Sequence, residues 1–507
     1  FRPGPMELIP DFVKRKQGQE RVEFIDKRVE PILSPTYGIM VYQEQVMQIA
    51  QVIGGYSLGA ADLLRRAMGK KKAEEMAQHR DIFKAGAMKN GVSEQRAEQL
   101  FDLMEKFAGY GFNKSHAAAY ALVAYQTAYF KAHHAAAFMA ANMSAIMDDT
   151  DKVQQFCEDT IANGLAVLPP DIHASEFRFV PVDAKRIRYG LGAVKGTGES
   201  AIAHIVEARE RGGPFKELFD FCRRVDERIV NRRVIESLVR AGAFDSINDH
   251  RASLMASVGI AMEAAEQENR AASQNSLFGN AYATTEGPKL LDTARWGAKE
   301  QLQNEKLALG YYFSGHPFES YAAEVEAIVK TRLAKLQPQG QVVIVAGIIY
   351  SIRQQQTRRG RMAVVVLDDS TARVELTVFN ELFESHRNWL KEDQLLIVEG
   401  KATFDNFTQG LRLTADRLYD FAAARRRFAR KVRLYCNGQS SGSKLKELLA
   451  PYRNGGEGGC PVSVIYRNDD AVAEIELGDA WKVRLDDGLI NSLGNWIEPN
   501  NVQIVYP

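Results

Sequence analysis

The sequence predicts a multidomain chain of mixed α and β structure. Its 507 residues suffice for roughly three to five domains. The apolar residues follow a mostly helical period from Phe1 to about Leu165, and they change to short alternating strands between Gln341 and Tyr419. Between these regions, Glu263–Gln301 is polar and rich in small residues, with little periodicity from Ala271 onward, so we expect an exposed linker there.

Composition leaves the function class open. The 65 Lys+Arg residues balance 64 Asp+Glu residues, so only local clusters of charge can indicate nucleic-acid binding. The four cysteines lack zinc-ligand spacing and are expected to be reduced thiols in a cytoplasmic protein. No apolar run is long enough to cross a bilayer, and no signal peptide opens the chain. Because the first residue is Phe1 rather than Met, we expect a fragment whose N-terminal part is missing.

Four helices are expected in the first region. Apolar spacing predicts helices at Met40–Ile53, Asp62–Arg66 and Glu94–Phe107. Ser115 is expected to be the N-cap of a long Ala-rich helix, His116–Phe138.

The middle region begins at a predicted domain boundary, Leu168–Pro169–Pro170, because consecutive prolines disfavour the continuation of a helix. Short β-like stretches follow at Phe177–Val182 and Arg188–Leu191. Two helix–loop–helix units are then expected near Gly190–Arg209 and Asn231–Phe244.

Short strands in the last third predict a small barrel, for which an OB-fold is the natural candidate. They lie at Val342–Ile352, Met362–Leu367, Val374–Phe379, Leu395–Thr403 and Leu411–Leu418. The basic run from Arg425 to Lys431 marks a second boundary. After it, a small α+β unit is expected, with a helix and strands at Lys444–Leu449, Val462–Tyr466, Val472–Leu477 and Trp481–Leu485.

Two polar groups lie at expected helix ends in the first region. One is a cation cluster around Gly69, made of Arg65, Arg66, Lys70, Lys71 and Lys72. The other is the run Asn113–Lys114–Ser115–His116. Both groups suit the phosphates of a nucleotide or a DNA backbone. Composition alone favours the plainer alternative, which is a pair of capped and solvated helix ends.

A glycine-rich loop precedes the first helix of the middle region. It contains Lys195–Gly196–Thr197–Gly198. Glycines allow positive φ and a close approach of backbone amides to a phosphate at the helix start. The alternative is a tight structural turn. The Lys–Gly–Thr–Gly form resembles a helix–hairpin–helix element, which grips the duplex backbone without reading sequence.

Arginines gather in or near the first barrel hairpin, and phenylalanines lie near a second barrel loop. They are Arg353, Arg358, Arg359, Arg361, Phe404 and Phe407. Cations and aromatic rings suit single-stranded nucleic acid, while the alternative is a solvated hairpin with the phenylalanines in the core.

Two other short runs carry possible function. In the linker, Leu277 and Phe278 follow Gln274 closely, and they suit either an apolar pocket on a partner or packing on a neighbouring domain. Asp149–Thr150–Asp151 has the spacing of paired metal-binding carboxylates, but we interpret it as a helix end and turn. No Ser/His/Asp or Cys/His nucleophile set stands out.

Several of these motifs resemble the alpha-subunit family of bacterial DNA polymerase III, the C-family replicative DNA polymerases. Tyr110–Tyr120 matches the fingers domain of that family nearly residue for residue, and Arg2–Pro5, Tyr42–Met47 and Phe107–Phe112 match it in order and spacing. Gln274–Phe278 resembles the peptide with which bacterial polymerases bind the sliding clamp.

The resemblance covers the whole chain and implies the C-terminal portion of the subunit. It implies a mostly α fingers domain (1–166), a clamp-binding domain with a helix–hairpin–helix (167–290), a linker (291–338), an OB-fold domain (339–424) and a small α+β domain like the tau-binding domain (425–507). The match is loose beyond about Arg430.

The resemblance also implies partners and site residues. Nucleotide and phosphate contacts fall to Arg65, Arg66, Lys70, Lys114, Ser115 and His116. DNA contacts fall to Lys195, Gly196, Gly198, Arg353, Arg358, Arg359 and Arg361, and clamp contacts fall to Gln274, Leu277 and Phe278. The implied partners are primer-template DNA, a dNTP, the sliding clamp, the clamp-loader tau subunit and single-stranded DNA at the OB domain.

Catalysis in this family needs Mg²⁺ held by palm aspartates, and these precede the segment that this chain resembles. We therefore assign no catalytic or metal-binding residue here, and we expect the fragment alone to be inactive. Two alternatives remain. One is a non-catalytic scaffold that binds DNA and the clamp, which would not need the fingers segment. The other is an error-prone paralogue, which would tend to lack the clamp peptide and the terminal domain.

Overall fold

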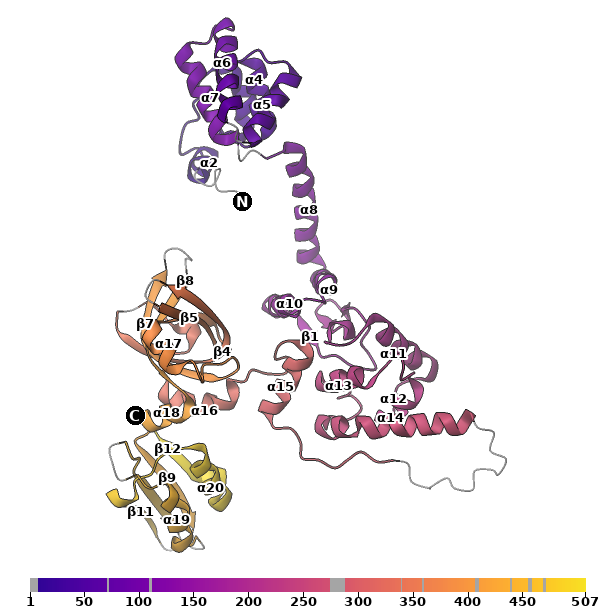
Figure 1. The fold of residues 1–507 in the computed structure, drawn as a ribbon, viewed down its shortest axis with the longest axis vertical. Coiled ribbons are helices and arrows are strands. Elements are labelled where there is room, and N and C mark those ends of the chain that lie inside the picture. The colour runs from indigo at the N-terminus through magenta and orange to yellow at the C-terminus, as the bar shows by residue number, and fades with distance from the viewer. Residues whose placement is uncertain are drawn as a thin grey trace. The chain divides into compact units, whose positions relative to one another are not determined.

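The computed structural model describes residues 8–70, 73–108, 112–273, 288–338, 340–357, 360–405, 410–437, 440–454, 458–467 and 471–507. The chain divides into two compact units, Phe1–Phe138 and Met139–Pro507 (Figure 1). Among the helices in the described ranges, none is both long enough and apolar enough to cross a membrane.

The first unit is helical. Its helices are α2 (Ile9–Lys16), α3 (Glu30–Leu33), α4 (Gln43–Val52), α5 (Leu58–Lys70), α6 (Ala73–Lys89), α7 (Glu94–Ala108) and α8 (Lys114–His133). Side chains from α4 to α7 make one core, with Ile49, Leu64, Phe83 and Phe101 fully buried. At one point the backbones approach so closely that a Cβ on Gly86 would lie 1.9 Å from the carbonyl oxygen of Gly54.

The start of α8 differs from the prediction. Asn113, not Ser115, is the N-cap, and its side chain accepts a hydrogen bond of 2.8 Å from the His116 amide. The prediction of Ser115 as the cap was wrong, because an Asn side chain reaches the third amide of a helix as well as a Ser does. The helix ends at His133, and a separate helix, α9 (Ala135–Ala145), follows, so the single helix expected to reach Phe138 was wrong.

The second unit begins with a helical body. A small sheet of order β1-β3-β2 joins Ala166–Leu168, Arg186–Arg188 and Val180–Pro181. The larger helices are α10 (Thr150–Ala162), α11 (Glu199–Gly212), α12 (Leu218–Arg224), α13 (Arg232–Arg240), α14 (Arg251–Ser273) and α15 (Ala298–Leu309).

Helices α14 and α15 correct the predicted linker at Glu263–Gln301. Helix α14 runs into this range as far as Ser273, and α15 begins in it at Ala298. Inside this range Ala265 is buried at helical spacing from Val258 and Ala261, and so small an apolar residue gives only a weak helical signal. Within 291–338 the structure also places α16 (Glu319–Ile328), which packs on the barrel that follows.

The barrel confirms the predicted OB-fold. It closes in the order β4-β5-β6-β8-β7. The strands are β4 (Val342–Thr357), β5 (Gly360–Asp368), β6 (Arg373–Val378), β7 (Leu395–Asp405) and β8 (Gly410–Tyr419), with α17 (Asn380–His386) between β6 and β7. Val345, Val365, Leu376, Leu396 and Leu413 fill the interior and are fully buried.

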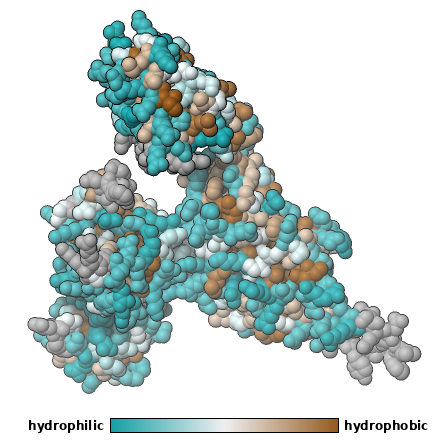
Figure 2. All heavy atoms as spheres, turned by 45° about the horizontal axis from the view of Figure 1, so that its top comes forward, coloured by the Kyte–Doolittle hydropathy of each residue, from teal (hydrophilic) through white to brown (hydrophobic). Residues whose placement is uncertain are grey.

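The terminal domain has a sheet of order β11-β10-β9-β12. Its elements are α18 (Phe421–Phe428), β9 (Lys431–Asn437), α19 (Gly442–Leu449), β10 (Val462–Arg467), β11 (Val472–Glu476), α20 (Asp487–Ile497) and β12 (Val502–Val505). The predicted strand Trp481–Leu485 was wrong, because only Val483 forms isolated bridges there, to Arg453 and Cys460. In Figure 2 the lobe of barrel and terminal domain presents a mainly hydrophilic surface.

Candidate nucleic-acid interface

The N-terminus of α4 brings the two predicted phosphate motifs together. The side-chain oxygen of Gln43 lies 3.3 Å from Arg65 on α5, and the Tyr42 ring lies 5.8 Å from the Lys114 ammonium on α8. Backbone bonds fasten the segment that leads into α8 to the same place: the Gln43 amide donates to the Phe112 carbonyl at 2.8 Å. Residues 70 positions apart along the chain therefore share one surface of the first unit.

The backbone amides at the start of α8 are already occupied. The Lys114 amide donates to both carboxylate oxygens of Glu44 at 2.9 Å, and the His116 amide donates to Asn113. A carboxylate at a helix N-terminus occupies the position that a phosphate would take. The side chains of Lys114, Ser115 and His116 are exposed instead, so any phosphate would be bound by side chains rather than by these amides.

Arg65 and Arg66 are held by one carboxylate. Asp62 accepts from Arg65 at 2.8 Å and from Arg66 at 2.9 Å. Its hydrogen bond to the Arg65 guanidinium holds the pKa of Asp62 below its usual value. Arg66 remains 64% exposed. Asp62 thus orients two guanidinium groups at the surface, where a phosphate would compete with it for them.

The predicted glycine loop forms a hairpin in front of α11. Gly196 has φ +86°, which favours glycine, and the Lys195 amide donates to the Ala308 carbonyl at 2.7 Å. Gly198 precedes α11 without a capping side chain, so the first-turn amides of that helix keep their capacity to meet an anion. Lys195, Gly196 and Gly198 are all exposed.

Arg233 is a candidate that the sequence analysis missed. It lies on α13, and its Nε would be 3.6 Å from a Cβ built on Gly196. The signal was present, because Asn231 caps α13 and is followed by Arg232 and Arg233. The exposed guanidinium of Arg233 therefore lies beside the hairpin loop.

The barrel presents a cationic and aromatic face. Arg353 on β4 pairs with Glu375 on β6 at 2.9 Å, and Arg361 on β5 pairs with Glu384 at 3.2 Å. A cavity of about 320 Å³ is lined by Arg353, Gln355, Met362, Val364, Glu375, Thr377, Phe379, Arg412 and Thr414. Phe404 is 50% exposed rather than buried in the core. Phe379 and Arg412 were missed because each reads in sequence as an ordinary strand residue.

Part of the predicted site lies outside the described residues. This holds for the backbone of Lys71, Lys72, Gln274, Leu277, Phe278, Arg358, Arg359 and Phe407, and for the side chain of Lys70. Asp149 is the N-cap of α10 and pairs with Lys152 at 2.9 Å, so it begins a helix rather than ending one. All four cysteines are buried thiols without a disulfide partner.

Sequence profiles of known families match successive parts of the chain. They describe the bacterial DNA polymerase III alpha subunit finger domain (residues 1–91), a helix-hairpin-helix motif (164–254), an OB-fold nucleic acid binding domain (343–420) and the DNA polymerase III subunit alpha C-terminal domain (444–497).

Whole-chain comparisons agree with the profiles. DNA polymerase III subunit alpha of Neisseria meningitidis serogroup A is 46% identical over 99% of this chain. The proteins of the same name from Vibrio cholerae and Escherichia coli K12 are 43% and 42% identical over 100% of it. The chain spans 44–45% of the length of these relatives. It belongs to the alpha-subunit family of bacterial DNA polymerase III.

Proposed function

We propose that this chain is part of the catalytic subunit of a bacterial replicative DNA polymerase, which extends a primer on a DNA template from dNTPs in the cytoplasm. In this proposal the chain supplies nucleotide and DNA contacts and the attachments to accessory proteins. The main support for this proposal is one observation: residues 42–44 contact both Arg65 and Lys114, so these two residues lie on one exposed surface. A surface of this kind fits the polymerase activity that membership of this family suggests.

The first unit would contact the triphosphate of the incoming nucleotide and the primer-template backbone. Arg65 and Arg66 offer planar donors that match phosphate oxygens in pairs, whereas Lys114 offers a point charge. His116 and Ser115 stand beside Lys114 on the first turn of α8. Lys70, at the end of α5, would complete the set from the sequence.

The second unit would hold DNA without reading its sequence. The hairpin at Lys195–Gly198, together with Arg233, suits the backbone of a duplex. The barrel face around Arg353 and Phe404 suits single-stranded DNA, because cations attract the backbone and exposed rings stack on bases. From the sequence, Arg358, Arg359 and Arg361 join the proposed DNA contacts.

We also propose the division of the chain into fingers (1–166), clamp-binding (167–290), linker (291–338), OB-fold (339–424) and tau-binding-like (425–507) parts. The peptide Gln274–Phe278 follows the end of α14 and would bind the sliding clamp. The terminal domain would bind the clamp-loader tau subunit, which rests on the C-terminal-domain profile.

The Mg²⁺ ions of polymerase chemistry would be held elsewhere in the longer subunit. In the described part of the chain, no group of three or more His, Cys, Asp or Glu residues is placed to hold a metal ion. Because the palm aspartates of this family are expected to precede the segment that this chain matches, we assign no step of nucleotidyl transfer to these residues and propose that the chain alone does not extend a primer. Primer extension by the isolated chain with dNTPs and Mg²⁺ would contradict this.

The nucleotide role is tested by Lys114→Ala in the full-length subunit. Removing one hydrogen bond to a charged group costs about 1.5–3 kcal/mol, so kcat/KM for the dNTP should fall roughly 10- to 150-fold. Lys152→Ala, which removes an exposed lysine that pairs with Asp149, is the matched control. Equal values for both variants would favour the scaffold alternative.

The clamp role is tested by the double variant Leu277→Ala/Phe278→Ala. Loss of two anchors should cost on the order of 2–4 kcal/mol of clamp affinity, measured by calorimetry with the purified sliding clamp. Leu291→Ala, at an exposed leucine of the next described segment, is the control. Unchanged binding would mean that the peptide packs within the chain, and it would reopen the error-prone alternative.

A further inference from the structure

The barrel is fastened firmly to the terminal domain. Arg425 on α18 is buried and bonds Glu324 on α16 at 2.7 Å and Asp487 on α20. Around this arginine, a shared apolar cluster includes Phe318 of the segment before α16 and Ile397 of the barrel. Because the contacts are apolar and the buried charge of Arg425 is paired, α16, the barrel and the terminal domain form one body.

The barrel meets the helical body differently. The Arg373 guanidinium on β6 bonds the Glu158 carboxylate on α10 at 2.7 Å, and the Tyr350 hydroxyl bonds Gln154 at 3.3 Å. A cavity of about 440 Å³ lies at this junction and is lined by residues of α10, of the segment after α15 and of the barrel. Glu158 and Arg373 are half and one-third exposed, so this ion pair is weak and sensitive to salt.

The chain that joins the two bodies passes from one to the other around Gly315, and Lys306 of α15 makes a second ion pair across the junction, with Asp393 of the barrel. The amides of Phe313 and Ser314 donate to the buried Glu305 carboxylate of the helical body at 3.2 and 2.9 Å. Two residues later, the His316 ring lies 3.3 Å from Asp368 of the barrel. Gly315 stands between them, and a Cβ there would meet only one atom, at 3.8 Å. Gly315 is therefore the natural pivot.

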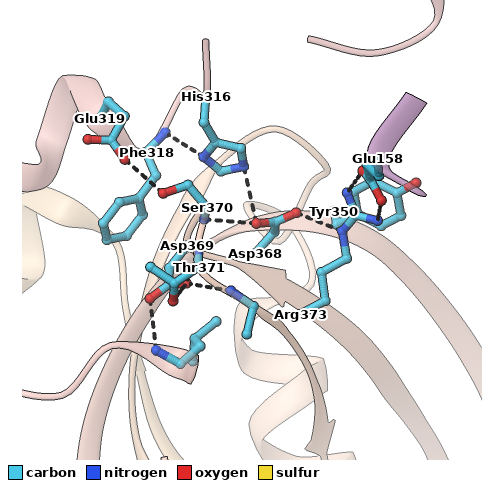
Figure 3. A network of polar contacts seen from close by, with 12 residues as sticks. Glu158, His316, Phe318, Glu319, Tyr350, Asp368, Asp369, Ser370, Thr371 and Arg373 are labelled. Carbon is cyan, nitrogen blue, oxygen red and sulfur yellow. Dashed lines mark hydrogen bonds and ion pairs between the residues drawn. The ribbon is translucent and has the colours of Figure 1, made fainter. Parts of the chain in front are cut away.

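Asp368 connects the pivot with the ion pair (Figure 3). One of its oxygens bonds His316, and the other accepts from Arg373 Nε at 2.7 Å. The Ser370 amide donates to the same carboxylate at 2.9 Å. Burial alone would raise the pKa of Asp368, but the hydrogen bonds from His316 and Arg373 outweigh it and lower the pKa to about 2. The carboxylate therefore stays charged and points Arg373 toward Glu158.

We propose that Asp368, Arg373 and Glu158 form a releasable latch, and that the barrel, α16 and the terminal domain turn as one body about Gly315 when it opens. Asp368 and Arg373 are then positioning residues, since they set where the barrel face lies relative to the helix–hairpin–helix body. The consequence for DNA rests on the proposed function, but the latch itself does not.

The test measures a distance in the absence of DNA, so its outcome is independent of DNA binding. Spin labels are placed at Glu210→Cys on α11 and Glu381→Cys on α17, both exposed, and their separation is measured by double electron–electron resonance. All four native cysteines are buried, so they should react slowly with the label.

The latch predicts one dominant distance at low salt. Glu158→Gln should raise the ratio of open to latched molecules about 1.4- to 5-fold, the range expected for an exposed ion pair. Salt at 1 M should act in the same direction, because the screening length falls to about 3 Å. Asp368→Asn should also broaden the distribution.

A matched control removes an ion pair that lies within one body. Glu447→Gln breaks the exposed pair with Lys444 on α19 and should leave the distance unchanged. A distribution that is the same in the wild type, Glu158→Gln and 1 M salt would overturn the latch. A shift of equal size in Glu447→Gln would overturn it too, because the effect would then be one of net charge.

Discussion

Replacing Glu305 by Gln should weaken the second unit through a buried charge. Glu305 is 1% exposed, and it accepts from Arg251 at 2.9 Å as well as from the amides of Phe313 and Ser314. A glutamine of the same shape removes the charge and turns an NH₂ group toward one of these donors. Arg251 is itself buried, so it would lose one of its two carboxylate partners.

The magnitude follows from what remains around Arg251. Breaking a buried ion pair costs about 3–5 kcal/mol when the remaining charge is left uncompensated. Asp245 still bonds Arg251 at 2.6 Å, so we expect the lower end, about 3 kcal/mol. At roughly 2 °C per kcal/mol, typical of larger domains, the melting temperature of the unit should fall by about 6 °C.

Differential scanning calorimetry measures the melting temperature, and amide hydrogen exchange measures the protection of the backbone amides that donate to Glu305. The exchange of Phe313 and Ser314 should accelerate most, because their acceptor is weakened. Glu300→Gln, at an exposed position of the same helix, serves as the control and should change neither quantity. The reasoning is refuted if both variants lower the melting temperature equally, or if the two amides exchange as in the wild type.

Three other perturbations have defined outcomes. The pKa of Asp368 is lowered from 3.8 in the unfolded chain to about 2 in the folded chain. Its charged form therefore contributes about 2 kcal/mol to the free energy of unfolding above pH 4, and this contribution should disappear as the pH falls toward 2. Urea unfolding should show this loss in the wild type and not in Asp368→Asn. Gly400→Ala should destabilise the barrel by about 1–3 kcal/mol in urea unfolding, because the new Cβ would lie 2.3 Å from the Thr414 carbonyl oxygen. Gly442→Ala is the control and should be nearly neutral, because a Cβ at Gly442 would lie in open space. Arg233→Ala should weaken duplex binding for every sequence and reduce the salt slope of the binding constant by about 0.9, measured by fluorescence anisotropy; an unchanged slope would place Arg233 off the DNA.

The fold was predictable where the hydrophobic period was strong. Every second residue of a barrel strand enters the interior, as Ala363, Val365 and Leu367 do, and short apolar strands between turn signals have few competing explanations. Strand β12 was missed because it has only four residues, and its place in the sheet depends on pairing across most of the terminal domain, with Leu434 opposite Val502. Strand β9 was missed although Val432, Leu434 and Cys436 alternate in it, because the basic run that leads into it was interpreted as a domain boundary.

The candidate site was predicted as a set of residues, and its arrangement comes from the structure. The cations near Arg65 and Lys114 stand out in the sequence because they are dense. Their juxtaposition depends on Gln43 and Glu44, which are ordinary polar residues at the start of a helix and carry no distinguishing pattern. Glu44 also accepts the hydrogen bond of the Lys114 amide at the start of α8, and this contact is visible only in the folded chain.

A common feature of these surfaces explains the nearly neutral composition. At the proposed nucleotide and barrel faces, arginines are held by a carboxylate: Arg66 by Asp62, and Arg353 by Glu375. A phosphate that binds there must replace a carboxylate, so part of the electrostatic gain is spent on breaking an existing pair. Such pairing weakens non-specific attraction to polyanions while keeping the guanidinium groups oriented. Overall charge is therefore a poor guide to the proposed nucleic-acid surface, because arginines such as Arg66 and Arg353 are each balanced by a neighbouring carboxylate.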